Sequence, residues 1–110
     1  MSDELLVGND NSIRVRGLKN TDTGSYMNAC TTATWELRTA ADGGGTQVSS
    51  GSMAYVAASN GEWLGGIDDA VSLTVGTEYW LTVVLVESGA RYYVNRPFTA
   101  VRRRGKTVLN

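Results

Sequence analysis

The sequence contains no histidine, and this absence excludes more function classes than any other feature of its composition. Histidine is the usual general base near neutral pH, the commonest metal ligand and the usual pH switch. A Ser-His-Asp or Cys-His catalytic site therefore cannot be built from this chain alone. With Cys30 as its one cysteine, the chain also cannot form an internal disulfide or a structural zinc site. We expect a protein that is not an enzyme and needs no cofactor, with Cys30 as a small packed residue and not a nucleophile.

Long apolar runs are also missing, since none approaches the roughly 20 residues that a membrane-spanning helix needs. The first residues, Met-Ser-Asp-Glu, are acidic where a signal peptide would be basic. We therefore expect a protein that is made in the cytoplasm of its host and has no membrane partner. The length of 110 residues suits one domain with one hydrophobic core.

Short segments of alternating apolar and polar residues recur along the chain, separated by turn residues, which is typical of a β-sandwich or barrel. The strands expected from this pattern cover residues 12–18, 26–38, 47–57, 62–67, 70–75, 78–87 and 91–103. As an alternative to the strand over 70–75, Asp68 and Asp69 could cap a brief helical turn. The chain has no amphipathic helix of useful length, and we predict an all-β protein.

The segment 73–81 contains the sharpest local signal. A strand is expected to end, Gly76 to turn the chain, and Tyr79 to begin the most apolar strand three residues later. This arrangement resembles the tyrosine corner of immunoglobulin-like sandwiches, in which the tyrosine hydroxyl bonds to upstream backbone. Trp35 on an early central strand resembles their core tryptophan. We predict an immunoglobulin-like antiparallel β-sandwich of about seven to eight strands over residues 1–104, followed by a basic and polar tail over 105–110.

Charge is distributed unevenly along the chain. Residues 1–90 contain all eleven acidic residues and four basic ones, whereas residues 91–110 contain six basic residues and no acidic one. The two parts carry net charges of −7 and +6, which the total of −1 hides. The basic end has three interpretations: a solvated terminus, a contact with nucleic-acid phosphates, or an arm that docks on an acidic neighbouring subunit. The acidic body would repel DNA, so we expect no nucleic-acid partner and favour the arm.

Several turn and corner motifs occur between residues 6 and 104. They are the segments 8–18 and 22–29, the Gly61-x-Trp63-x-Gly65 turn, Gly76-x-x-Tyr79, and a terminal strand that ends in arginines. Together they resemble a family of small proteins encoded among the structural genes of tailed bacteriophages. One departure is the segment 52–55, where many members carry an aromatic-proline pair. The resemblance implies a virion protein, such as a capsid-accessory, head–tail or tail protein, whose partners are virion subunits including copies of itself. It supplies no catalytic residues.

The strand expected over 78–87 is apolar on both faces. The residues expected to face the core are Tyr79, Leu81, Val83 and Leu85. The residues on its other face would be covered by a loop, by the tail or by another subunit. The residues that we expect at a subunit interface are Trp80, Val84 and Val86 on this strand, Arg91, Tyr92 and Tyr93 on the next, and Arg102, Arg103, Arg104 and Lys106 in the arm.

Two ligand sites are alternatives. Oxygen ligands for calcium are offered by four residues in two turns: Asn9, Asp10, Asn11 and Asp22. Their spacing does not match a known calcium loop, and such residues dominate ordinary turns. Groups for a sugar are offered by carboxylates and an indole: Glu62, Asp68, Asp69 and Trp63. The sequence predicts a structural component of a bacteriophage virion, with a carbohydrate-binding or host-surface adhesion module on the same fold as the alternative and a DNA-contacting head protein as a third hypothesis.

Overall fold

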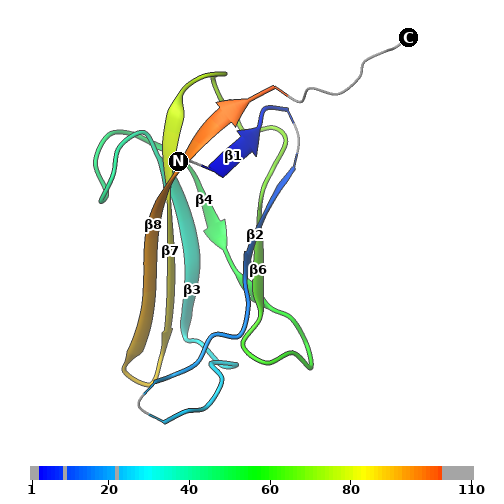
Figure 1. Ribbon diagram of the computed structural model, residues 1–110, viewed down its shortest axis with the longest axis vertical. Helices are drawn as coiled ribbons and strands as arrows, with labels where there is room; N and C mark the ends of the chain where they lie inside the picture. The colour runs from blue at the N-terminus through cyan, green and yellow to red at the C-terminus, as the bar shows by residue number, and fades with distance from the viewer. Residues whose placement is uncertain (1–2, 9, 22, 103–110) are drawn as a thin grey trace.

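The computed structural model describes residues 3–8, 10–21 and 23–102, and these residues contain eight β-strands and no helix (Figure 1). The strands are β1 (Asp3–Leu6), β2 (Asn11–Val15), β3 (Thr32–Arg38), β4 (Gln47–Ser52), β5 (Ala54–Tyr55), β6 (Trp63–Ile67), β7 (Glu78–Glu87) and β8 (Ala90–Val101). The all-β prediction is therefore confirmed for this part of the chain. The tail expected over 105–110, Arg103, Arg104, Asn9 and Asp22 lie outside the described residues.

The strands form two sheets that pack face to face as a β-sandwich (Figure 1). The larger sheet has the order β1-β8-β7-β3-β4, and the smaller has the order β2-β6-β5. This is the strand order of an immunoglobulin-like sandwich, as the sequence predicts. One detail of that prediction is wrong: the larger sheet is not purely antiparallel, because β1 runs parallel to β8, with Leu5 beside Ala100.

The hydrophobic core lies between the two sheets and is built from alternate residues of the central strands. On β3, Trp35 is 4% exposed and lies beside Val83 of β7. The buried residues of β7 are the four that alternation predicts: Tyr79, Leu81, Val83 and Leu85. Burying one valine or leucine side chain of this core stabilises the fold by about 1.5–3 kcal/mol.

The tyrosine corner is present. The Tyr79 hydroxyl accepts a hydrogen bond from the backbone N–H of Thr74 over 2.8 Å. Gly76 between them has a φ of 86°, a conformation that glycine adopts without steric cost. The Gly76 N–H also donates to the Ala100 carbonyl over 2.8 Å. The connection from the smaller sheet to β7 is therefore held by β7 and β8 together.

A two-residue turn, Ser88 and Gly89, joins β7 and β8 into a long hairpin. Both residues have positive φ, 45° and 83°, which is the conformation of a type I′ turn. The register pairs Glu87 with Ala90 and continues without a bulge along β7. Each side chain of β8 is therefore assigned to one face of the sheet by its partner on β7.

Two expected strands are shorter than their sequence patterns. The strand expected over 26–38 begins only at Thr32, and the one expected over 47–57 is divided by Met53. At Met53 the chain leaves the larger sheet for the smaller one. The Met53 side chain is 4% exposed, so the apolar alternation continues through this crossing although the pairing changes.

The strand expected over 70–75 is absent: the segment begins with a turn after Asp68 and continues without regular structure. The Asp68 carboxylate accepts a hydrogen bond from the Ala70 N–H, and the Asp68 carbonyl accepts one from the Val71 N–H. Such local bonds of an aspartate compete with strand pairing. Val71 still packs against the core, whereas Val75 is 48% exposed. The apolar residues of this segment are thus partly buried although they form no strand. The alternative of a turn capped by Asp68 is closer to the observed structure.

Candidate interaction surfaces

The outward face of the larger sheet carries most of the residues that the sequence assigns to an interface. Trp80, Val84 and Val86 are half-buried and point away from the core, because they alternate with the buried residues of β7. Arg91 and Tyr93 on β8 lie opposite Val86 and Val84, so they share this face. We call these five residues the outer-face patch.

The outer-face patch combines apolar groups with a cation. Tyr93 is 45% exposed, and the Arg91 guanidinium lies over its ring, 5.0 Å from the ring centroid. Trp80 is separated from the two valines by Thr82, whose hydroxyl accepts a hydrogen bond from the Asn95 amide over 2.7 Å. The patch therefore consists of two apolar parts with a polar group between them, which suits a partner surface of mixed polarity.

Tyr92 does not share this face, which differs from the expectation. It lies opposite Leu85, which is fully buried, and it packs against the core. Successive side chains of a strand point to opposite faces, so Tyr92 and its neighbours Arg91 and Tyr93 cannot belong to one surface. Tyr92 instead lines a space between the two sheets.

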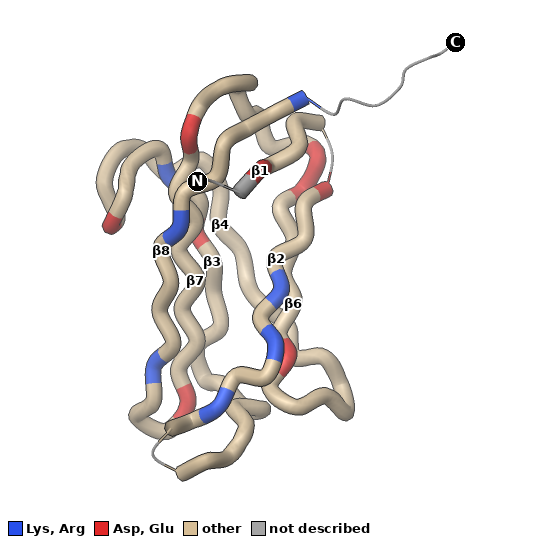
Figure 2. The backbone as a smooth tube through the Cα atoms, in the orientation of Figure 1, with Lys and Arg blue, Asp and Glu red and all other residues tan. Residues whose placement is uncertain are grey.

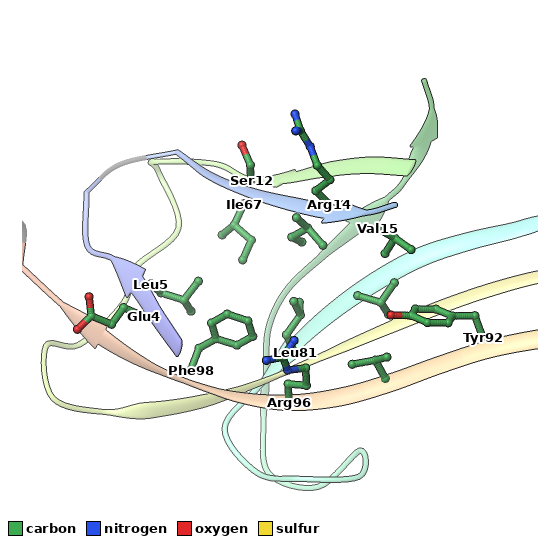
Figure 3. Close-up of a pocket in the computed structure, with 13 residues that line it drawn as sticks. Glu4, Leu5, Ser12, Arg14, Val15, Ile67, Leu81, Tyr92, Arg96 and Phe98 are labelled. Atoms are coloured by element: carbon green, nitrogen blue, oxygen red, sulfur yellow. The ribbon is translucent and has the colours of Figure 1, made fainter. Parts of the chain in front are cut away.

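This space is a cleft of about 340 Å³ on the side of the sandwich where β2 faces β8 (Figure 3). Ile13 and Val15 line it from β2, Tyr92 and Val94 line it from β8, and Val83 lines it from β7. We call it the seam cleft, because it lies along the seam between the two sheets. Its walls are mainly apolar.

The end of the seam cleft lies beneath β1. Leu5 and Phe98 lie together there (Figure 3). Three charged residues also line the cleft: Glu4, Arg14 and Arg96. Arg96 lies on the inward face of β8, between Val94 and Phe98. These two neighbours are partly buried, whereas Arg96 is exposed. The cleft therefore has apolar walls with charged residues at its margin, and of these Arg14 is ion-paired with Glu62 and points away from the cleft (Figure 3).

Three carboxylates converge where the β1–β2 loop meets the turn after β6. The side-chain oxygens of Asp10, Asp68 and Asp69 lie within 4.8 Å of one another, and all three residues are exposed. The Asp69 N–H donates a hydrogen bond to the Asp10 carboxylate over 2.8 Å, and the Ala70 N–H donates one to the Asp68 carboxylate over 3.0 Å. The bond to Asp10 thus joins the two loops, and the bond to Asp68 lies within the turn after β6.

Two of these carboxyl groups have different acidities. The hydrogen bond from the Ala70 backbone, together with one from Asp69, lowers the pKa of Asp68 from its ordinary value. The hydrogen bond with Asp68 raises the pKa of Asp69, and the negative charges of Asp10 and Asp68 raise it further. Asp69 is therefore the member of the pair that takes up a proton first as the pH falls.

This cluster differs in composition from the calcium site that the sequence suggests. Of the four suggested residues, Asn9 and Asp22 lie outside the described residues, and Asp10 is the one that joins the cluster. Asn11 bonds to backbone instead: its side-chain oxygen accepts from the Leu6 N–H over 2.9 Å, and its amide donates to the Leu6 carbonyl over 3.1 Å. Carboxylate oxygens are ligands of hard cations, but three exposed carboxylates alone do not identify a cation site.

The residues suggested for sugar binding are not brought together. Trp63 is 5% exposed, and its indole N–H donates to the Met27 carbonyl over 2.8 Å, so the ring is a core residue and cannot stack on a sugar. Glu62 precedes β6 and forms an ion pair with Arg14 over 3.3 Å. Asp68 follows the other end of β6. The length of the strand therefore separates the carboxylates.

Cys30 is half-buried and packs against the core. Burial raises the pKa of its thiol, and the negative charge of Glu87 raises it further. Both effects disfavour the thiolate, which is the nucleophilic form of cysteine. These surroundings agree with the expectation of a small packed residue.

Basic residues lie on β8, on β2 and the segment that follows it, and at the end of β3, whereas acidic residues lie mostly in loops and at strand ends (Figure 2). At the end of β8, the Val7 N–H donates to the Val101 carbonyl over 2.9 Å, so the chain leaves the sheet beside the β1–β2 loop. Arg102, the first residue of the expected arm, is exposed there. The rest of the arm lies outside the described residues.

None of the described residues belongs to a helix that is long and apolar enough to cross a membrane. Comparisons of the chain with models of protein families, with curated proteins and with solved structures found no match.

Proposed function

We propose that the protein is a non-enzymatic structural component of a bacteriophage virion, as a capsid-accessory, head–tail or tail protein, and that it works through contacts between subunits. The outer-face patch is the observation that carries this proposal. The outward face of a sheet in a monomeric sandwich is expected to be polar. On this face β7 and β8 instead carry four large apolar or aromatic residues: Trp80, Val84, Val86 and Tyr93. The likeness of the turn and corner motifs to tailed-phage structural proteins supports the virion as the assembly.

The composition of the outer-face patch is typical of the centre of a protein interface. Tryptophan, tyrosine and arginine contribute most often to binding energy, and the patch contains one of each: Trp80, Tyr93 and Arg91. On β3, the neighbour of Val84 is Thr34, a small polar residue. The neighbours of Thr82 and Trp80 are instead Glu36 and Arg38, which form an ion pair over 2.6 Å. A partner would therefore meet a neutral surface beside Val84 and a charge pair beside Trp80.

The basic arm supplies a second contact in this proposal. It begins at Arg102 and continues to Lys106, and the first 90 residues of a neighbouring copy carry a net charge of −7. Attraction between them brings subunits together over distances of about 10 Å at ordinary ionic strength. The partners are then virion proteins, including copies of this chain, and the acidic body disfavours nucleic acid.

Light scattering after size-exclusion chromatography tests the outer-face patch. Val84→Lys places a charge in the patch, and Leu64→Lys is its matched control, because Leu64 is also half-buried and points outward from the centre of the smaller sheet. We expect the wild-type protein and Leu64→Lys to self-associate and Val84→Lys to have the mass of a monomer. A wild-type protein that stays monomeric at every concentration would contradict self-association through this face.

The presence of this protein in a virion is tested separately, by mass spectrometry of purified particles from infected cells. We expect peptides of this protein in the particles, and genes for portal, capsid or tail-tube proteins beside its own gene. Its absence from particles, when it is present in the infected cell, would contradict the proposal.

In the alternative, a carbohydrate-binding or host-surface adhesion module on the same fold, Trp80 is the tryptophan that could contact a sugar, since Trp35 and Trp63 are buried. Quenching of tryptophan fluorescence by glycans in the wild-type protein, lost in Trp80→Phe, would favour that alternative.

A further inference from the structure

The seam between the two sheets is closed along only part of its length. β1 pairs with the last residues of β8, from Phe98 to Val101. Residues 90–95 of β8 have no strand of the described chain on the side away from β7, and β2 is likewise the edge of the smaller sheet. The seam cleft opens between these two edges. One further strand, in line with β1, would complete the larger sheet and cover the cleft.

The open edge of β8 presents hydrogen-bonding groups to such a strand. In an antiparallel ladder, alternate residues turn their N–H and C=O groups toward the partner and away from it. The two-residue turn makes Glu87 and Ala90 a bonded pair, so the next pair, Val86 and Arg91, is not bonded. The Val86 carbonyl agrees with this, because it accepts a hydrogen bond from the Thr31 N–H on the β3 side.

The alternation continues along β8. Arg91, Tyr93 and Asn95 therefore turn their backbone N–H groups toward the open edge. The next residue in this series is Pro97, which has no N–H, so the edge available for pairing ends before it. Three N–H groups, with the carbonyls of the same residues, thus face away from β7. Residues 18–21 lie across a small hollow from residues 89–92, so an added strand would reach the edge most freely at Tyr93 and Asn95.

Side chains of an added strand would alternate between two different surroundings. Those that point inward would enter the seam cleft and contact Val15, Tyr92 and Val94, so apolar residues fit there. Those that point outward would lie beside Arg91 and Tyr93, where an acidic residue can pair with the guanidinium. The geometry therefore selects a segment in which apolar and acidic residues alternate.

The charges along the seam agree with that composition. β2 and β8 contain no acidic residue, and they contain Arg14, Arg91 and Arg96. Arg14 forms an ion pair with Glu62, and Glu4 also lines the cleft, so Arg91 is the arginine that an acidic residue of an added strand would meet. The basic arm of a second copy would be repelled by these arginines. Two β8 edges placed side by side would bring the arginines of both copies together, which disfavours a second copy of this chain as the occupant.

We propose that the seam cleft receives an extended segment of a different protein, with alternating apolar and acidic residues, which adds as a strand to the open edge of β8. This is strand addition, in which main-chain hydrogen bonds supply affinity and pockets for alternate side chains supply specificity. The inference goes beyond the proposed virion role. It concerns the edge of the sheet, and it meets the outer-face patch at Arg91 and Tyr93, which border both surfaces.

Hydrogen exchange followed by NMR tests this proposal with synthetic peptides. The probe is acetyl-Val-Glu-Val-Thr-Val-Glu-Val-amide, and its control has lysine in place of glutamate. We expect the acidic peptide to slow the exchange of the Arg91, Tyr93 and Asn95 amides by about tenfold or more, because these amides become hydrogen-bonded. The methyl signals of Val15 and Val94 should shift in the same titration, and the lysine peptide should cause neither change.

Charge reversal gives the matched variants. Arg91→Glu should reverse the preference between the two peptides, so that the lysine peptide binds and the acidic peptide does not. Arg102→Glu changes a charge outside the seam, so this variant should bind the acidic peptide as the wild-type protein does. Both positions are exposed, so neither variant should unfold.

Three results would overturn the proposal. The first is equal binding of both peptides, or no binding of either. The second is protection of the three edge amides in the free protein that is lost on dilution, which would mean that a second copy occupies the edge. The third is binding of laurate that shifts the methyl signals and displaces the peptide without slowing amide exchange, which would mean that the cleft takes an apolar small molecule.

Discussion

Gly51 on β4 lies directly opposite Trp35 on β3, and the indole occupies the space where a side chain at position 51 would begin. A Cβ atom at Gly51 would lie 2.6 Å from the indole nitrogen and 2.8 Å from two ring carbons. The ring is enclosed by the core, so a small movement cannot relieve this contact. The absence of a side chain at position 51 is therefore a condition for burying Trp35.

Gly51→Ala should lower the free energy of unfolding by about 1–3 kcal/mol, the usual cost of overpacking a core. Urea denaturation followed by tryptophan fluorescence measures it. The control is Gly66→Ala on β6, where an added Cβ would have its nearest neighbour at 3.8 Å. Equal losses in the two variants would show that Trp35 moves aside.

Tyr79→Phe should lower the free energy of unfolding by about 1 kcal/mol, because the Thr74 N–H loses its acceptor. Thermal unfolding followed by circular dichroism measures the change. Tyr93→Phe is the control, since the Tyr93 side chain is largely exposed and its loss of a hydroxyl should leave the unfolding temperature unchanged. A Tyr79→Phe variant as stable as wild type would show that the corner is held by packing alone.

The aspartate pair should give opposite effects of pH on stability. The pKa of Asp69 is raised in the fold, so its charged form disfavours folding at neutral pH and this penalty disappears as the pH falls through the raised pKa. The pKa of Asp68 is lowered, so its charged form stabilises the fold above the ordinary aspartate pKa and this gain is lost on acidification.

Asp69→Asn should therefore stabilise the protein at neutral pH, and Asp68→Asn should destabilise it. Both differences from wild type should shrink as the pH approaches the range in which aspartates are protonated. Urea midpoints at a series of pH values measure this, and a destabilised Asp69→Asn at neutral pH would contradict the assigned acidities.

Cys30 should react slowly in the folded protein. Its raised pKa keeps the thiol protonated near neutral pH, and partial burial limits access. Alkylation by iodoacetamide, followed by mass spectrometry, should be slower in the native protein than in urea. A native rate that equals the rate in urea would mean that the thiol is fully accessible.

The basic arm should contribute to assembly in a salt-dependent way. Replacing Arg102, Arg103 and Arg104 with alanine should weaken self-association at low ionic strength, and the difference from wild type should shrink as salt screens the charges. Sedimentation velocity at several salt concentrations measures both effects. If assembly responds neither to salt nor to these substitutions, the arm has no part in it.

The strands that could be predicted from the sequence are those with one buried face. β7 has the bounds expected from its alternation, and β6 begins one residue later than expected. β1 was not predicted, because Leu5, Leu6 and Val7 are consecutive apolar residues without alternation. Its pairing also joins the first and last strands of the chain, a contact that no local pattern indicates.

The residues of a candidate surface could be predicted where alternation along one strand decides which side chains point outward. Trp80, Val84 and Val86 are outward because alternation along β7 requires it. The inward position of Tyr92 depends on the register of the hairpin, and the pair Tyr92-Tyr93 contains no signal of which ring faces inward. The seam cleft could not be predicted, because it arises from the shortness of β1 and from the relation of two edges that belong to different sheets.

The parallel pairing of β1 with β8 determines how the domain responds to mechanical force. A pull on the two ends of the chain would act in opposite directions along these neighbouring strands, because β1 enters the pairing at Asp3 and β8 leaves it at Val101. The load is then shared as shear by the whole set of hydrogen bonds between them. The bonds must fail together and cannot be peeled apart one at a time, so a tether through both ends would load the sandwich in its more resistant direction.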